Sequence, residues 1–412
     1  MKQFRSNRLI RISSLFLLLA TLASHAFGQT LTTIYNFGAT PGDGQAPGSG
    51  VVIDKAGNLF GTTGVGGVQG SFGTVFELTP PAVAGNGWTE TILHRFNGSP
   101  DGRNSQSRLV MTATGALVGT TLLGGAENEG TVYMVAPPVG QGNWRERILH
   151  SFGTIPGDVV TPNYGLMLTP EGFYGVDQVG ANGFGAVYLL TPSANGKSWT
   201  QNILYSFKGS SSGDGADPGG ELARDAKGNF YGVTGQGGAN NLGAVYEVSP
   251  PAANGGPWTE AVLYSFNGTD GTLPAGPLRI GAGGVLYGTT DGGGTNGAGT
   301  VFQLTPPAAA GDPWTHTILH TFGGTGDGTS PENGVILDKK GRLFGTAGQA
   351  IFMLKPPQVA GGDWNETVLH TFSGPDGFVA TTPLTVSGNT LYGTTELAGA
   401  FGHGTAFQLT LP

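Results

Sequence analysis

The sequence contains no cysteine and few charged residues. Charged residues make up 11% of the 412 positions, against about 25% in an average globular protein. The absence of cysteine excludes disulfide bonds, thiol nucleophiles, iron–sulfur clusters and zinc sites with cysteine ligands. No stretch has the apolar spacing of a long amphipathic helix. The fold must therefore be held by packing and hydrogen bonds, and we expect it to consist of strands.

Basic residues are especially scarce. The chain has 19 Lys and Arg against 27 Asp and Glu, a formal net charge of −8. Four of the basic residues lie within the first eleven positions, so the rest of the chain carries 15 basic against 27 acidic residues, a net charge of −12. A chain this acidic, without a basic run, repels phosphate backbones. Nucleic acid is therefore not an expected partner.

The N-terminus has the pattern of a secretory signal peptide over residues 1–28. Basic residues precede an apolar run over 12–23, and small residues suited to cleavage after Ala26 or Gly28 follow. The run is shorter than the roughly 20 residues that a membrane span needs, and no later segment qualifies. We expect export to the periplasm, the cell surface or the medium, and a single domain over 29–412. The basic residues are Lys2, Arg5, Arg8 and Arg11.

Glycine is abundant, with 76 residues, and its distribution reveals an internal repeat. Close variants of a motif (L/F)-(Y/F)-G-T-T recur seven times. The steps between copies are 56 to 58 residues, except for a last step of 48. Such a period indicates a repeat architecture. The glycines of the motif are Gly61, Gly119, Gly175, Gly232, Gly288, Gly345 and Gly393.

The tryptophans follow the same period. All six precede a short run that ends in Phe, such as TILHRF at 91–96. The seventh such run, TTIYNF at 32–37, has no Trp and stands at the other end of the chain. The six residues are Trp88, Trp144, Trp199, Trp258, Trp314 and Trp364.

One unit contains four short runs of strand-forming residues bounded by Gly, Pro and Asn. In the first unit these are 51–54, 59–63, 73–79 and 88–96, and the diproline at 80–81 ends the third strand, since proline cannot donate to a β-ladder. Four strands per unit, repeated seven times, predict an all-β, seven-bladed β-propeller.

The two ends of the chain distinguish a closed ring from an open solenoid. The chain begins with a lone fourth strand, about 31–37, and ends after a third strand near Pro412. Pairing that N-terminal strand with the three C-terminal strands completes one blade and leaves no long free edge. We therefore predict closure by this pairing.

The sixth unit is shorter than the others. Only seven residues separate Gly345 from Phe352, where the other units have 13 to 15. We expect a notch on the face that carries the loops between second and third strands.

The repeat resembles a known family. Leu286–Pro306 (LYGTTDGGGTNGAGTVFQLTP) and Leu59–Pro80 look like the choice-of-anchor tandem repeat GloVer family of exported bacterial proteins. The elements Asp54–Phe60 and Asp225–Tyr231 are similar to NHL-type propeller repeats. The resemblance implies an exported repeat protein, commonly held at the envelope by a C-terminal sorting segment, and implies no activity. The sequence ends without such an anchor, so we expect a soluble product.

A carboxylate follows the fourth strand of every unit. These residues could bind Ca²⁺, because hard cations prefer clustered oxygen ligands. They could equally form Asx-type turns, in which Asp accepts backbone N–H groups and a following Gly supplies positive φ. Because an Asp is present at this place in every unit, a structural role in the turns is favoured. We therefore expect no metal or other cofactor. The residues are Asp43, Asp101, Asp158, Asp214, Asp270, Asp327 and Asp376.

Four histidines share one strand position with three tyrosines, on different blades. This alignment favours packed aromatic side chains over convergent metal ligands. The tryptophans are likewise interpreted as blade packing rather than as platforms for carbohydrate stacking. The histidines are His94, His150, His320 and His370, and the tyrosines are Tyr35, Tyr205 and Tyr264.

The departures from the repeat are the best indication of a functional site. Charges occur in or beside the innermost strands, which are otherwise apolar, and need partners or water there. Further acidic residues fall on or near the long loops of the same face, including Glu127, Glu129 and Glu396. We hypothesise a polar, mostly acidic ligand site around the channel mouth beside the sixth-unit notch. The candidate residues are Arg108, Asp177, Glu221, Arg224, Arg279 and Asp291.

These observations favour an exported propeller that acts as a monomeric binding module at the cell envelope. Loops on a rigid scaffold are suited to bind a glycan or an envelope protein. Two alternatives are an enzyme that acts on an extracellular polysaccharide with carboxylates at the channel mouth, and a purely structural repeat without a cleft. No catalytic constellation is identified in the sequence.

Overall fold

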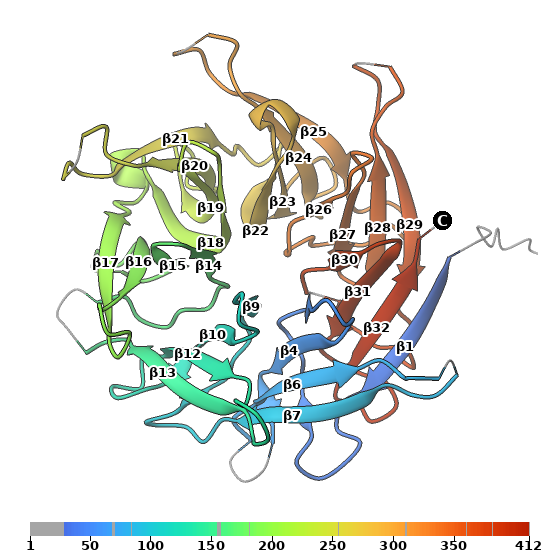
Figure 1. The fold of residues 1–412 in the computed structure, drawn as a ribbon. Helices are drawn as coiled ribbons and strands as arrows, with labels where there is room; N and C mark the ends of the chain where they lie inside the picture. Colours follow the sequence, from blue (N-terminus) through green and yellow to red (C-terminus); the bar gives the residue numbers. More distant parts are fainter. Residues whose placement is uncertain are drawn as a thin grey trace, which may run out of the picture.

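Short strand-forming runs and glycine-rich turns fold the chain into seven four-stranded antiparallel sheets around a central axis (Figure 1). The structure is a computed structural model, and it describes residues 29–411 apart from 68–70, 84, 155–157, 181, 254, 310, 360 and 381. The predicted signal peptide lies outside the described residues. The predicted seven-bladed propeller of four-stranded blades is confirmed.

Blades 1 to 4 follow one another in sequence, and their strands run from the axis outward. Blade 1 consists of β3 (Val52–Ile53), β4 (Leu59–Thr63), β6 (Thr74–Thr79) and β7 (Thr89–Arg95). Blade 2 consists of β9 (Val110–Met111), β10 (Leu117–Thr121), β12 (Thr131–Ala136) and β13 (Arg145–Ser151). Blade 3 consists of β14 (Met167–Thr169), β15 (Gly172–Asp177), β16 (Ala186–Pro192) and β17 (Trp199–Ser206). Blade 4 consists of β18 (Gly215–Arg224), β19 (Phe230–Gly237), β20 (Ala244–Ser249) and β21 (Thr259–Ser265).

Blades 5 and 6 repeat this order, and blade 7 takes its outer strand from the N-terminus. Blade 5 consists of β22 (Thr272–Ile280), β23 (Leu286–Gly292), β24 (Thr300–Thr305) and β25 (Thr315–Thr321). Blade 6 consists of β26 (Ile336–Leu337), β27 (Leu343–Ala347), β28 (Ala350–Lys355) and β29 (Asn365–Thr371). Blade 7 consists of β30 (Thr385–Ser387), β31 (Thr390–Thr395), β32 (Thr405–Thr410) and β1 (Thr30–Asn36).

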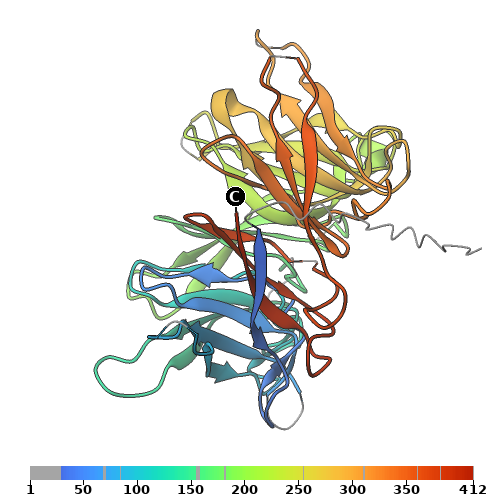
Figure 2. The ribbon, with the colours of Figure 1, turned by 90° about the vertical axis from the view of Figure 1, so that its right-hand side faces the viewer.

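The ring closes as predicted. Strand β1 pairs antiparallel with β32, from Thr30 opposite Thr410 to Asn36 opposite Thr405. Figure 2 shows β1 lying along the C-terminal strands at the edge of the disc. The first and last strands thus share one sheet, so unfolding either end opens the ring.

A few small elements complete the fold. Two-residue strands β2 (Gly44–Gln45) and β5 (Val65–Gly66) pair in one loop region, and β8 (Gly102–Arg103) and β11 (Leu123–Gly124) pair in the next. Single 3-10 turns occupy η1 (Ser210–Ser212) and η2 (Ala282–Gly284). Among the described residues, no helix has the length and apolar character needed to cross a membrane.

The core lies between blades, where aromatic side chains meet at every interface. The Phe that ends each fourth strand contacts the aromatic residue of the third strand of the next blade, with ring centroids 4.9–5.7 Å apart. Phe37 makes this contact with Phe76 across the closing interface. Such edge-on or tilted aromatic pairs add about 0.5–1.5 kcal/mol each to their buried area. Every interface therefore depends on the same pair.

The glycine of the (L/F)-(Y/F)-G-T-T motif makes room for this pair. A Cβ at Gly61 would lie 2.5 Å from Cζ of Phe76, and one at Gly288 would lie 2.6 Å from Cζ of Phe302. Real Cβ atoms do not approach so closely, so the aromatic ring of the third strand requires a bare backbone on the second. The repeated glycine is thus explained by close packing.

The tryptophans pack at the outer part of the interfaces, as predicted. Trp88, Trp144, Trp314 and Trp364 each contact an aromatic side chain of the preceding blade. The two others, Trp199 and Trp258, contact a Phe of their own blade.

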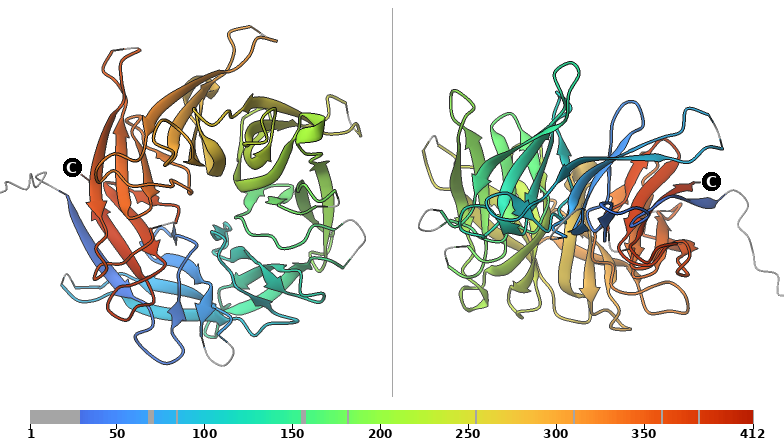
Figure 3. Two further views of the ribbon diagram at one scale, coloured as in Figure 1. Left: turned by 180° about the vertical axis from the view of Figure 1, so that it is seen from behind. Right: turned by 90° about the horizontal axis from the view of Figure 1, so that it is seen from below.

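The shortened sixth unit forms a tight hairpin. Strands β27 and β28 are joined by two residues, Gly348 and Gln349, with Ala347 opposite Ala350. The other blades carry longer loops here, and Figure 3 shows the loops that project from the disc. The deletion therefore shortens blade 6 on the face that carries these loops, as predicted.

One connection in each blade adopts a left-handed backbone without glycine. Seven residues just before the innermost strands, or near their beginning in β18 and β22, have φ between 51° and 61°. In six of them the backbone N–H donates to a carbonyl of the preceding blade, over 2.8–3.1 Å. Positive φ is unusual for branched residues and costs about 1–3 kcal/mol. The blade-to-blade hydrogen bond offsets this strain. The residues are Ala46, Asn104, Thr161, Asp217, Leu273, Ser330 and Val379.

Leu273 allows a direct measurement of this strain, because its side chain is 47% exposed. Leu273→Gly and Leu273→Ala both remove the side chain, but only Gly adopts φ of 51° without steric cost. After the entropy of Gly in the unfolded chain is subtracted, we expect Leu273→Gly to be more stable than Leu273→Ala by up to about 1 kcal/mol. Urea midpoints at an unchanged m value measure the difference. An Ala variant as stable as the Gly variant would refute the strain.

Candidate functional site

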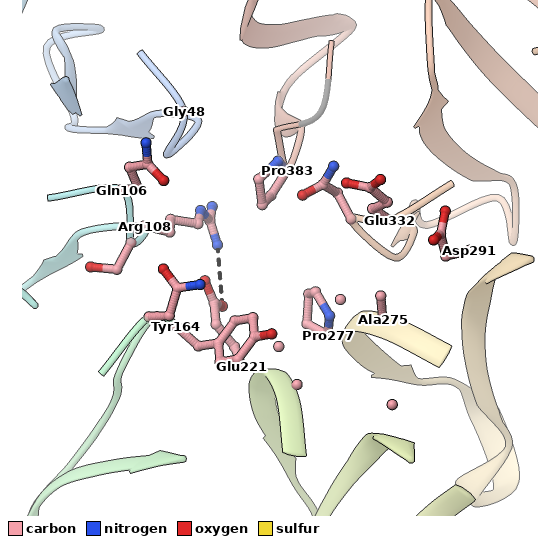
Figure 4. Close-up of a pocket in the computed structure, with 18 of the residues that line it drawn as sticks. Gly48, Gln106, Arg108, Tyr164, Glu221, Ala275, Pro277, Asp291, Glu332 and Pro383 are labelled. Atoms are coloured by element: carbon pink, nitrogen blue, oxygen red, sulfur yellow. Dashed lines mark ion pairs between the residues drawn. The ribbon is translucent and has the colours of Figure 1, made fainter. Parts of the chain in front are cut away.

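A polar cavity lies at the axis, on the face that carries the loops between second and third strands. Its volume is about 410 Å³, and residues from all seven blades line it. Ligand sites of proteins typically measure about 300–1,000 Å³. Figure 4 shows side chains converging on it from opposite sides. Of the six predicted ligand residues, Arg108, Glu221 and Asp291 line this cavity.

Arg108 reaches into the channel and lines the cavity. It precedes β9 at a position that is Gly in blades 1, 3 and 6 and Pro in blades 5 and 7. Its Nη1 lies 3.9 Å from Oε2 of Glu221 in blade 4, drawn as a dashed line in Figure 4. Its Nη2 donates to Oγ1 of Thr385 in blade 7, over 3.2 Å. Arg108 thus bridges three blades.

Arg279 belongs to the same polar group but lies outside the cavity wall. It sits on β22, is largely buried, and interacts favourably with Glu221 and unfavourably with Arg108. Burial lowers the pKa of its guanidinium, and Glu221 opposes this effect. Glu221 therefore stands between two arginines. A Cβ at Gly165 would lie 2.6 Å from its Oε1, so the absence of a side chain in blade 3 makes the approach to Arg108 possible.

Carboxylates from blades 5, 6 and 7 form an acidic arc on the other side of the cavity. We use this name for Asp291, Glu332 and Glu396, all of which line the cavity. Burial raises the pKa of Glu332, and the charges of Asp291 and Glu396 raise it further. Asp291 near the end of β23 and Glu396 just after β31 hold the position that Gly348 occupies in blade 6. Asp291 and Glu396 thus lie on either side of the shortened loop of blade 6.

Neutral hydrogen-bonding groups lie opposite the arc. The side-chain amides of Gln106 and Asn163 line this side, and Tyr164 stands beside them. Nε2 of Gln178 donates to the hydroxyl oxygen of Tyr164 over 3.0 Å. Burial, together with Asp217 and Glu332, raises the pKa of Tyr164 to about 12. Tyr164 is therefore a neutral phenol at physiological pH.

Two predicted residues lie away from the cavity. Arg224 is at the far end of β18, where its Nη1 lies 3.8 Å from Oε2 of Glu171 and its guanidinium covers the ring of Phe230. Asp177 is 1% exposed, and its Oδ2 accepts the backbone N–H of Gly180 over 2.6 Å. The expectation that both lie at the channel mouth is wrong. Arg224 is too far along its strand, and Asp177 turns into its own blade.

Sequence reasoning missed several cavity residues. Gln106, Asn163, Tyr164 and Glu332 stand just before the innermost strands, where most other units carry Gly, Ala, Ser or Thr. Asp217 is the residue at positive φ in its blade. Aligning the units by the apolar residue that begins each innermost strand would have indicated the first four.

The seven repeated carboxylates occupy a different part of the molecule, beside the outer strands. Each accepts one or more backbone N–H groups of the preceding turn, as Asp43 does from Ala39 over 2.9 Å. Each also lies 2.6–3.4 Å from the Tyr hydroxyl or His Nε2 of its own fourth strand. These contacts hold the turn and the strand together. The expectation that these carboxylates bind no metal stays a prediction.

A glutamate of the next blade adds to four of these clusters. Burial and the neighbouring Asp charge raise the pKa values of Glu90 to about 8, and of Glu146 and Glu260 to about 7. The pKa of Glu366 is raised for the same reasons. Among the described residues, one His–Asp–Glu group has ligand atoms within 4.8 Å of one another, and it comprises His94, Asp101 and Glu146. Because Tyr35, Asp43 and Glu90 hold the same positions at the closing interface, this geometry is that of a shared structural contact.

The raised pKa of Glu90 predicts that the stability of the closed ring depends on pH. The hydroxyl of Tyr35 in β1 lies 3.2 Å from Glu90 and 3.1 Å from Asp43, and Arg95 is the cation that faces them. Since the pKa of Glu90 rises from 4.5 to about 8 on folding, the folded state binds more protons, and stability falls as the pH rises between these values. We expect Glu90→Gln to reduce this fall in urea midpoint. Exposed Glu127→Gln is the control, and equal pH profiles of Glu90→Gln and the wild type would contradict the assignment.

Comparisons with solved structures support the fold. The β-propeller domain of Cps50 (Swd1) from Myceliophteria thermophila is 13% identical with a TM-score of 0.52, and covers 91% of this chain and 99% of its own. PorZ, a surface component of the type IX secretion system of Porphyromonas gingivalis, is 12% identical with a TM-score of 0.50, and the match covers 88% of this chain and 46% of PorZ.

A third similar structure is the extracellular domain of a candidate hybrid two-component system from B. thetaiotaomicron. It is 12% identical with a TM-score of 0.50, and the match covers 92% of this chain and 41% of that one. At such identities the likeness shows the fold alone. None of the curated proteins matches the sequence significantly.

The repeat itself identifies the family. The profile of the Gloeobacter/Verrucomicrobia repeat matches residues 21–180 and 148–351. These segments together cover well over half of the chain, and they contain the first six copies of the glycine motif. The chain therefore belongs to the Gloeobacter/Verrucomicrobia repeat family.

Proposed function

We propose that this protein is a ligand-binding module that acts outside the cytoplasm, with its site in the cavity at the channel mouth. One observation carries the proposal: several departures from sevenfold repetition meet in one cavity. Arg108, Glu221 and Tyr164 occupy positions that are mostly Gly, Pro or Ser in other blades, and all three line the cavity together with Glu332. Substitutions that the scaffold does not need are expected where a ligand is bound.

Two further observations support the location and the module. The N-terminal pattern over 1–28 is that of a signal peptide. Two of the similar propellers belong to a bacterial surface component and to an extracellular domain. A purely structural repeat has no use for a cavity of about 410 Å³ with unlike residues on each blade.

The carboxylates favour a second candidate function, the hydrolysis of an extracellular polysaccharide. Glycosidases pair a protonated carboxylic acid with an ionised carboxylate across the scissile bond. Glu332 has a raised pKa and interacts with Asp291 and Glu396, which suits it to the role of the acid. In this case Glu332→Gln should abolish hydrolysis but retain binding.

Filling the cavity tests the location of the site. The side chain of Ala275 lies in the cavity in Figure 4, so Ala275→Trp should occupy the space of the ligand. We expect it to weaken the binding of any ligand found on a glycan array by at least about tenfold. Ala252→Trp, at an exposed position of an outer loop, makes the same change elsewhere and should bind normally. A hydrolysis screen on the same oligosaccharides separates binding from catalysis. Unchanged binding by Ala275→Trp, with an intact fold by circular dichroism, would place the site elsewhere.

A further inference from the structure

We infer that the ligand of this cavity carries a primary ammonium group and that it is the terminal residue of an amino-sugar oligosaccharide. This inference rests on the proposed function, because it assigns a chemical class to the ligand of the same cavity. It is carried by the charge of the cavity wall, by the arrangement of its polar groups and by the contacts of Arg108.

The cavity wall is strongly negative. Five of its side chains are carboxylic acids and one is an arginine. That arginine, Arg108, is engaged by Glu221 and Thr385. It is therefore not available to neutralise the acidic arc on the far side. A recessed site with charges of one sign concentrates ions of the opposite sign. The five acids are Asp217, Glu221, Asp291, Glu332 and Glu396.

One buried oxygen of the acidic arc has no donor among the described residues. Asp291, Glu332 and Glu396 come from three successive blades. Burial raises the pKa of Glu332, and the charges of Asp291 and Glu396 raise it further. The Oδ1 atom of Asp291 is buried and has no hydrogen-bond partner among the described residues. A buried acceptor without a donor is costly. An ammonium group supplies three donors and one positive charge, and so satisfies both needs.

The opposite wall suits hydroxyl groups. Gln106, Asn163 and Tyr164 are uncharged there, and their amide and phenol groups both donate and accept hydrogen bonds. Figure 4 shows Gln106 and Tyr164 across the cavity from Glu332 and Asp291. A sugar with one ammonium group and several hydroxyl groups matches both walls, whereas a lysine side chain offers only the cation.

The contacts of Arg108 bear on which part of the ligand enters. Arg108 lines the cavity and reaches from blade 2 to Glu221 in blade 4 and to Thr385 in blade 7. A chain threaded through the channel would have to displace these contacts. The ligand is therefore expected to enter by an end, so that its terminal sugar is the residue recognised.

A pair of oligosaccharides that differ only in charge tests the inference. The β-1,4-linked glucosamine tetramer and its fully N-acetylated form have the same backbone, and titration calorimetry compares their binding to the purified chain. We expect the amine form to bind at least about tenfold more tightly, and its affinity to fall as salt rises, because salt screens the attraction. Equal affinities would overturn the inference while leaving the proposed function intact, provided that Ala275→Trp abolishes both.

Neutralising the arc gives the matching protein experiment. Asp291→Asn with Glu396→Gln should weaken binding of the amine tetramer by about tenfold or more, since charge-assisted hydrogen bonds are roughly twice as strong as neutral ones. The control, Asp312→Asn with Glu127→Gln, changes the net charge equally at exposed outer positions and should bind normally. If both double variants lose the same affinity for the amine tetramer, net charge alone explains the effect, and the inference is overturned.

Two other results bear on the identity of the ligand. Tetralysine that binds more tightly than the amine tetramer, and competes with it, would overturn the assignment to a sugar and indicate a basic peptide. If a glycan array yields only neutral or acidic ligands that Ala275→Trp abolishes, the cationic ligand is refuted and the binding module is supported. If no ligand depends on Ala275, the proposed function itself fails.

Discussion

The aromatic contact between neighbouring blades is the interaction on which the whole structure depends. A Phe at the end of one fourth strand packs against the third-strand ring of the next blade, and that ring lies on a glycine of the second strand. Three of the repeated sequence features, the terminal Phe, the aromatic residue and the motif glycine, are thus parts of one contact. Because the ring of blades is closed by β1, this contact also joins blade 7 to blade 1 through Phe37 and Phe76.

Side chains can differ between blades only where neither this aromatic contact nor the inter-blade hydrogen bonds constrain them. The connection before each innermost strand is held by its backbone, through the N–H of a residue at positive φ. The side chain at that position and those that follow it can therefore differ from blade to blade, as Asp217 and Leu273 do. These positions face the axis. The backbone therefore repeats seven times, while the side chains that line the cavity differ from blade to blade.

The candidate site was predictable in part. The departure of Arg108 and Glu221 from an otherwise small position, and the deletion after Gly345, located the channel mouth from sequence alone. Arg224 departs from the repeat just as clearly, yet it lies three residues beyond Glu221 at the other end of the channel. Two charged side chains meet only if they lie at the same level along the propeller axis. The sequence shows that both depart from the repeat, but it does not show this level. Glu332 was missed because it stands outside the strand, in a connection without strong pattern.

The sequence by itself determined the number of blades, the four strands in each, the closure by β1 and the reduced sixth loop. These follow from local patterns, because strand periodicity, turn residues and repeated spacing act over a few residues and are copied seven times. Only the tertiary structure decided which side chains share one cavity. Arg108, Glu221 and Thr385 are separated by more than a hundred residues of chain, and they meet because the ring brings blades 2, 4 and 7 to one axis. The same geometry pairs Glu90 with Asp43 across the closing interface, a contact between different units that no periodicity within one unit can indicate.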